Sequence, residues 1–429
     1  MEKRNVPKLR FKRFECEWKE YKLGDFLDFY TTNSLSRDCL NNDNGKVKNI
    51  HYGDIHMKFP TVLDIQKNQI PFINDDIDIS KIKEESFCKN SDLIFADASE
   101  DYDDIGKAIE LRNICNSKIV AGLHTILARD NKGITASGFK GFMLLNESVR
   151  KQIKILAAGA KVLGISKTNL SKVKVKLPSL EEQTKIANFL SNVDNIIEEQ
   201  EGKVKDLEQY KKGMMQKIFK QEVRFRDENG GEYPEWKYEK LGNLGETYSG
   251  LYGKTKENFG FGSGKYITYM NVFTNIRTDI NMIDLVDIKE NENQNKVLKG
   301  DILFTTSSET PKEVGMASVC DKEIENLYLN SFCFGFRLYD FKVINFEFMA
   351  YFLRSPKIRR KISILAQGST RYNLSKIELM KTKIRIPCLE EQTKIANFLS
   401  NIDNIIEKEN KKLEDLKLWK KGLLQQMFV

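Results

Sequence analysis

A thirteen-residue segment that occurs twice constrains this chain more than any other feature. LEEQTKIANFLSN runs from Leu180 to Asn192 and returns unchanged from Leu389 to Asn401, 209 residues later (389 minus 180). The whole chain has 429 residues, so the spacing is close to half its length. Repeat arrays generally need three or more units to bury their faces. Two units instead predict a pair related by a pseudo-twofold axis.

The repeat extends well beyond the identical segment. GAKVLGISKTNLSKVKVKLP, which ends at Pro178, aligns at the same spacing with GSTRYNLSKIELMKTKIRIP, which ends at Pro387. Further upstream SDLIFADAS resembles GDILFTTSS, and EWKEYKLGD resembles EWKYEKLGN, but the sequences between these anchors differ. Each half is therefore a variable head followed by a nearly constant tail.

Both tails show an apolar heptad pattern, which predicts a coiled coil of two long helices. A pseudo-twofold axis would make the two helices antiparallel. The alternative is that each helix docks separately on its own head. The apolar positions define a helix-pair seam, which consists of Leu190, Val193, Ile197, Val204, Leu207, Met214 and Ile218 in the first tail and Leu399, Ile402, Ile406, Leu413, Leu416, Leu423 and Met427 in the second.

The heads alternate short β-like runs with helical stretches. KNSDLIFADAS, KIVAGLHTILARD, KGDILFTTSS and LNSFCFGFRLYD are rich in β-branched and aromatic residues, whereas FEFMAYFLRSPKIRRKISILAQ is typical of a helix. We therefore predict an α+β fold in which two α/β heads are separated by an antiparallel coiled coil. The predicted boundaries are 1–177 for the first head, 178–221 for the central helix, 222–386 for the second head and 387–429 for the C-terminal helix.

Composition limits the class of protein. Hydrophobic residues make up 40% of the chain and charged residues 30%, and no apolar run is long enough for a membrane span. Seven cysteines without a CxxC pair predict reduced thiols in the cytoplasm. Lys and Arg dominate Ser148–Lys176 and Lys357–Arg385, which we interpret as matched phosphate-binding stretches.

Catalytic motifs are missing. The chain has no Walker A motif, and three histidines form no credible nucleophilic triad. His51 and His56 lack the spacing of a metal site. The glycine-rich segment FGFGSG (Phe259–Gly264) is expected to be a mobile loop rather than a cofactor loop. We therefore interpret the chain as a binding protein without a metal or cofactor of its own.

The order head, helix, head, helix resembles the specificity subunit of type I restriction–modification systems. Pro178 and Pro387, each followed by LEEQTKIANFLSN and then VDNII or IDNII, carry the resemblance, together with GISKTNLSKV and GSTRYNLSKIEL. The resemblance covers the whole chain. It implies a non-catalytic DNA-recognition subunit in which each head reads one half of a split target on double-stranded DNA.

The resemblance also implies partners. Two methyltransferase subunits would dock around the helices and methylate adenine, and restriction/translocase subunits would cleave unmodified DNA. S-adenosylmethionine, ATP and Mg²⁺ would be bound by these partners. The alternatives are a coiled-coil scaffold with two protein-binding heads, or a stand-alone DNA methyltransferase or nuclease.

Loops after the matched strands are the predicted DNA contacts, because side chains at base edges read sequence while phosphate contacts fix orientation. Arg371 is the sharpest prediction, because arginine is the commonest reader of guanine and the first copy has Val162 at this position. The other predicted contacts are Ala98, Ser99, Lys161, Lys167, His51 and Tyr52 in the first head and Lys254, Lys265, Thr306, Ser307, Ser308, Lys312, Tyr372 and Asn373 in the second.

Overall fold

The computed structural model describes residues 5–429 and divides the chain into two compact units. One unit combines Met1–Gly202 with Lys411–Val429, and the other is Lys203–Asn410. Each unit is therefore a head together with segments of both long helices. This division differs from the four consecutive segments expected from the repeat, because it follows packing rather than sequence order.

The first head is built on a five-stranded sheet in the order β2–β11–β7–β9–β5, with a four-stranded sheet, β10–β4–β6–β3, beside it. Alternation along β7 separates two cores, since Leu93 and Phe95 pack toward the helices while Ile94 and Ala96 pack toward the second sheet. The elements are β1 (Lys19–Lys22), β2 (Leu27–Tyr30), β3 (Leu40–Asn41), β4 (Lys48–Ile50), α1 (Tyr52–Met57), β5 (Val62–Asp64), β6 (Phe72–Ile73), β7 (Leu93–Ala96), β8 (Ala98–Ser99), β9 (Ala108–Arg112), β10 (Ile119–Ala121), β11 (Thr125–Asp130), α2 (Phe139–Leu144), α3 (Glu147–Leu156), β12 (Leu163–Gly164), α4 (Lys167–Leu170), β13 (Lys174–Leu177) and α5 (Leu180–Lys220).

The second head repeats this plan with fewer strands. Its main sheet has the order β15–β22–β18–β20, and a three-stranded sheet has the order β17–β16–β21. The elements are β14 (Lys237–Lys240), α6 (Leu241–Leu244), β15 (Gly245–Ser249), β16 (Phe259–Ile267), α7 (Tyr269–Thr274), β17 (Ile283–Val286), β18 (Ile302–Thr305), β19 (Ser307–Ser308), β20 (Ala317–Val319), β21 (Leu327–Leu329), β22 (Cys333–Leu338), α8 (Phe346–Phe352), α9 (Pro356–Ile364), β23 (Ala366–Gln367), β24 (Tyr372–Leu374), α10 (Lys376–Met380), β25 (Lys383–Ile386) and α11 (Leu389–Met427).

The prediction that FGFGSG is a mobile loop is wrong, because this segment forms the first part of strand β16. The strand pairs antiparallel with β17, with an irregularity between Phe259 and Gly264. At Gly262, where φ is +101°, an added Cβ would lie 2.7 Å from the carbonyl oxygen of Val286. Glycine at this position therefore permits the close approach of two strands.

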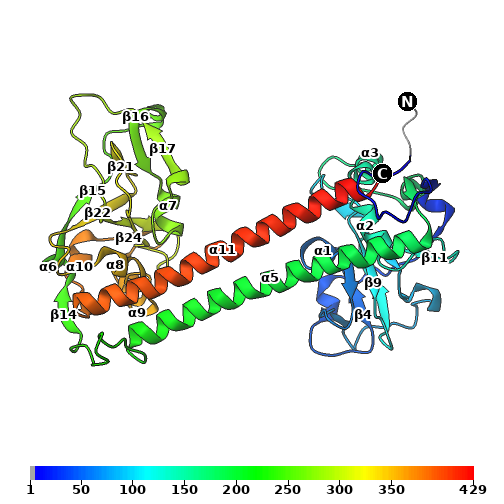
Figure 1. The fold of residues 1–429 in the computed structure, drawn as a ribbon, viewed down its shortest axis with the longest axis horizontal. Coiled ribbons are helices and arrows are strands. Elements are labelled where there is room, and N and C mark those ends of the chain that lie inside the picture. The colour runs from blue at the N-terminus through cyan, green and yellow to red at the C-terminus, as the bar shows by residue number, and fades with distance from the viewer. Residues whose placement is uncertain (1–4) are drawn as a thin grey trace. The chain divides into compact units, whose positions relative to one another are not determined.

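Helices α5 and α11 run antiparallel within each unit, as predicted (Figure 1). In the first unit Lys420 pairs with Asp194 at 2.5 Å, and in the second Lys211 pairs with Asp403. These two ion pairs occupy equivalent places in the repeat, since both residues are offset by 209. The structure buries nine of the fourteen seam residues and half-buries Leu207, Met214, Ile406, Leu413 and Leu416.

A matched pair of arginine clamps ties the start of each long helix to its head. Arg10 donates two hydrogen bonds to Glu182, each 2.8 Å long. Arg224 donates likewise to Glu391, at 3.2 and 2.8 Å, and the indole N–H of Trp236 adds a bond of 3.1 Å to the same carboxylate. Both glutamates are buried, so the bidentate arginine supplies the charge that makes their burial tolerable.

Replacing Glu391 by Ala is expected to lower the free energy of unfolding of the second unit by about 2–4 kcal/mol, because the Arg224 guanidinium loses its buried carboxylate partner and the Trp236 indole N–H loses its acceptor. Calorimetric unfolding of the full chain measures this loss. The neighbouring, exposed Glu390→Ala variant is the control and should change the free energy by less than about 0.5 kcal/mol. Equal stability of the two variants would show that the clamp contributes little.

Candidate nucleic-acid interface

A small three-stranded sheet in the second head gathers most of the contacts predicted for that head. Strand β19 pairs with β24, placing Ser307 opposite Asn373 and Ser308 opposite Tyr372, and β23 lies on the other side of β24. Thr306 precedes the first of these strands and Arg371 precedes the second. Residues predicted from two distant segments are therefore neighbours on one surface.

The first head has a matching but smaller arrangement. Strand β8 pairs with β12, with Ala98 opposite Gly164 and Ser99 opposite Leu163. The Nε2 atom of His56 lies 3.1 Å from the carbonyl oxygen of Ala98, which places helix α1 next to these strands. His51 and Tyr52 at the start of this helix thus lie in the same region.

A tight turn precedes β12 in one head and β24 in the other. Gly159 has φ of +140° and Gly368 has φ of +131°. An added Cβ would lie 2.0 Å from the carbonyl oxygen of Val162 in the first turn and 2.1 Å from that of Arg371 in the second. Only glycine fits this geometry, so the backbone is the same in both heads while the presented side chain differs.

Accessibility divides the predicted residues into two groups. Arg371, Asn373, Lys161, Lys265 and Lys312 are exposed, and Tyr52, Ala98, Thr306 and Tyr372 are half-buried. In contrast, His51, Ser99, Ser307 and Ser308 are buried. The Ser99 hydroxyl donates to the carbonyl oxygen of Asp101, so this side chain supports the strand from inside.

Two of the predicted lysines are committed elsewhere. Only 5% of the Lys254 side chain is exposed, and its ammonium lies 2.5 Å from a carboxylate oxygen of Glu292. The Lys167 ammonium donates to the carbonyl oxygen of Tyr30 at 2.8 Å. Lys265 lies on β16, in a different sheet from β19, β24 and β23. We therefore do not retain Lys254 and Lys167 as DNA contacts.

Several cations of the two basic stretches serve the fold, so phosphate binding remains a prediction only for the exposed ones. Arg150 donates to the carbonyl oxygens of Asp103, Ile105 and Gly106. Arg359 donates to the equivalent oxygens of Lys312, Val314 and Gly315, and burial lowers its pKa to about 10. Lys174 pairs with Glu20, and Arg385 with Glu235. Much of the basic character therefore supports the fold.

Two exposed rings that sequence reasoning missed lie beside these strands. Residue His124 precedes β11 and is 52% exposed, with its Nδ1 atom 3.4 Å from a carboxylate oxygen of Asp97. Phe332 precedes β22 and is 56% exposed, and the Arg371 guanidinium lies 5.7 Å from its ring centroid. Sequence reasoning missed them because no sequence motif marks either residue. An alignment of the two heads by strand pairing would have found them.

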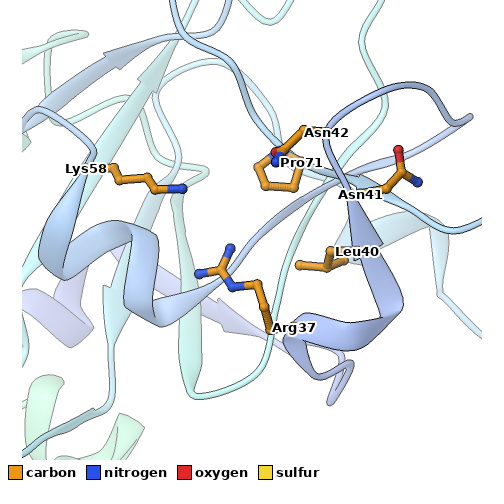
Figure 2. Close-up of a pocket in the computed structure, with 6 residues that line it drawn as sticks. All are labelled: Arg37, Leu40, Asn41, Asn42, Lys58 and Pro71. Atoms are coloured by element: carbon orange, nitrogen blue, oxygen red, sulfur yellow. The ribbon is translucent and has the colours of Figure 1, made fainter. Parts of the chain in front are cut away.

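Figure 2 shows a pocket of about 310 Å³ on the first head, toward which the side chains of Arg37 and Lys58 point. Both cations already share the buried carboxylate of Asp54, at 2.7 and 3.3 Å. The pocket is thus electrostatically compensated and is a poor candidate for binding an anion.

Across residues 5–429, no group of three or more His, Cys, Asp or Glu side chains has a geometry suited to a metal ion. Among the same residues, no helix is both long and apolar enough to cross a membrane. The candidate interface consists of strand ends, turns and exposed polar or aromatic side chains.

Comparison with known proteins identifies the family. The model of the type I restriction modification DNA specificity domain matches residues 15–209 and again 202–418. The putative type I restriction enzyme MjaX specificity subunit of Methanocaldococcus jannaschii is 30% identical over 321 residues, covering 71% of this chain and 70% of that protein. The MjaVIII specificity subunit of the same organism is 29% identical over 279 residues, covering 63% of this chain and 65% of its own length, slightly under two thirds.

Solved structures show the same fold. The S subunit of a type I restriction–modification system from M. genitalium has a TM-score of 0.55 at 15% identity, with 99% of each chain covered. A chain from a study of complex assembly and conformational transition of the type I R-M system has a TM-score of 0.57 at 14% identity, covering 96% of this chain and 97% of that one. Both domain matches, the relatives and the fold agree: the chain belongs to the type I restriction–modification DNA specificity family, as a non-catalytic DNA-recognition subunit that works with methyltransferase and restriction subunits.

Proposed function

We propose that each head reads one half of a bipartite, asymmetric DNA target while the helix pair sets the unread spacer between them. The observation that carries this proposal is the repeated interface: equivalent turns and strand pairs hold different side chains in the two heads. Gly159 and Gly368 keep the backbone alike, whereas Val162 stands where the second head has Arg371. Two unlike surfaces on a common frame favour two unlike half-sites.

The helix pair also offers a surface suited to identical partners. Exposed on α5 are Asn188, Asn192 and Asn195, which lie on one face because they are four and three residues apart. Ile196 beside them is 45% exposed. The four equivalent positions of α11 carry the same residues, also exposed, namely Asn397, Asn401, Asn404 and Ile405, of which Ile405 is 46% exposed.

These positions point away from the seam, so packing between the helices does not explain why α5 and α11 carry identical residues there. A surface that is the same in both halves cannot distinguish two different half-sites, so it suits one kind of partner used twice. We assign it to two methyltransferase subunits, which would methylate an adenine in each half-site, with restriction subunits acting on unmodified DNA. S-adenosylmethionine, ATP and Mg²⁺ would belong to these partners. This work would take place in the cytoplasm.

We expect a complex with only one methyltransferase from Ile196→Glu or from Ile405→Glu alone. The double variant is expected to bind no methyltransferase, because each substitution would bury a charge at one of the two contacts. Native mass spectrometry of the co-expressed proteins counts the subunits. Leu418→Glu is the control, since Leu418 is 69% exposed on α11 but has Gln209 as its counterpart. Two methyltransferases retained by the double variant would exclude this surface.

Arg371→Ala is expected to weaken binding of the target about five- to hundredfold and to relax one position in the second half-site. Competition binding with a target duplex and single-base variants measures both effects. Arg360→Ala removes an exposed charge from α9 and serves as the control. It should weaken binding to all duplexes alike; the same uniform loss in Arg371→Ala would make Arg371 a phosphate contact.

A further inference from the structure

His124 and Phe332 occupy the same position in the two heads, although their sequences differ. The amide of Asp97 donates to the carbonyl oxygen of His124 at 3.0 Å, and the amide of Thr306 donates to that of Phe332 at 2.8 Å. Strand registers agree, since Thr125 pairs with Ala96 and Cys333 pairs with Thr305. The backbone therefore presents a ring at one fixed place in each head.

Both rings stand outside the cores, at the strands that form the candidate interface. His124 has φ of +53°, a left-handed conformation that L residues adopt infrequently outside Asn, Asp and His. The conformation directs the chain into β11 while more than half of the imidazole stays exposed. Phe332 is a large apolar side chain left exposed beside a cationic guanidinium.

A tyrosine lies next to the same strands in each head. The Tyr52 ring meets the His124 ring edge-on, with centroids 5.3 Å apart. The Tyr269 hydroxyl donates to the carbonyl oxygen of Ser307 at 2.7 Å. Tyr52 opens α1 and Tyr269 opens α7, so each head places a tyrosine at the start of the short helix beside these strands.

We propose that His124 and Phe332 are specificity-determining residues that contact base edges, one in each half of the target; the inference rests on the proposed function. In the neutral imidazole, the Asp97 carboxylate oxygen 3.4 Å from Nδ1 of His124 favours the tautomer with its proton on Nδ1, in which Nε2 is the acceptor. This acceptor suits the exocyclic amino group of adenine or cytosine.

Phe332 cannot hydrogen-bond a base, so it reads by apolar contact, for which the methyl group of thymine is the major-groove partner. Arg371 lies over the same ring, and arginine pairs with the O6 and N7 atoms of guanine. The second half-site is therefore expected to contain a thymine next to a guanine. The amino-bearing base read by His124 belongs to the other half-site.

Selection from a random-sequence duplex library tests this assignment. The full chain bound to its methyltransferase is compared with complexes containing His124→Gly or Phe332→Ala, and the captured DNA is sequenced. Glycine adopts a positive φ readily, so His124→Gly removes the ring without disturbing the turn. Tyr102→Ala and Phe261→Ala remove rings of similar exposure, 53% each, from places outside the proposed contacts.

We expect His124→Gly to lose about ten- to hundredfold preference at one base pair of one half-site, and Phe332→Ala to lose a similar thymine preference in the opposite half. The control variants should enrich the unaltered motif.

Wild-type preferences in both variants would overturn the inference, although a split motif from the wild-type complex would leave the proposed function standing. A wild-type complex that enriches no motif would overturn both. Loss of the methyltransferase from Phe332→Ala with unchanged base preferences would make Phe332 a protein contact and overturn its assignment.

Discussion

The antiparallel packing of α5 and α11 is the interaction on which the rest of the structure depends. The hydrophobic core of each compact unit is not formed by its head alone, because it includes side chains from both helices. In the first unit Leu190 and Ile197 of α5 share a core with Leu423 and Met427 of α11. In the second, Ile218 lies in one core with Leu399 and Ile402. Because the apolar seam is not specific for register, equivalent Lys–Asp pairs along it are well placed to supply that specificity.

A frame of this kind separates two demands that conflict within one domain. Under the proposed function, the tails stay alike so that equivalent partners meet equivalent surfaces, and the reading surfaces differ because the target is asymmetric. The heads satisfy both by repeating backbone devices, such as the Gly159 and Gly368 turns and the carbonyl-capping Arg150 and Arg359. Exposed side chains at equivalent positions, Val162 against Arg371 at the turns and His124 against Phe332 before β11 and β22, are then able to vary without cost to the core.

The sequence predicted the large-scale fold but only part of the interface. Heptads and repeats have a period that can be read directly, so the helix pair and the α+β heads followed from the tails and strand patterns. Long-range strand pairing has no such period. Residues of β19 and β24 were predicted as contacts, but the pairing of the two strands was not. Charge was also ambiguous, because an arginine that caps buried carbonyls, as Arg359 does, has the same sequence signature as one that binds phosphate. Exposure of His124 and Phe332 depends on the ends of strands whose neighbours are remote in sequence.

The most direct measurement is a methylome of a host that lacks its own DNA methylation, expressing this chain with and without its cognate methyltransferase. Single-molecule sequencing would map N6-methyladenine. Two heads that read independently on one frame predict a split, asymmetric motif that appears only when both proteins are present. Methylation by the chain alone would contradict a non-catalytic role, and a continuous or palindromic motif would contradict two unlike heads that each read one half.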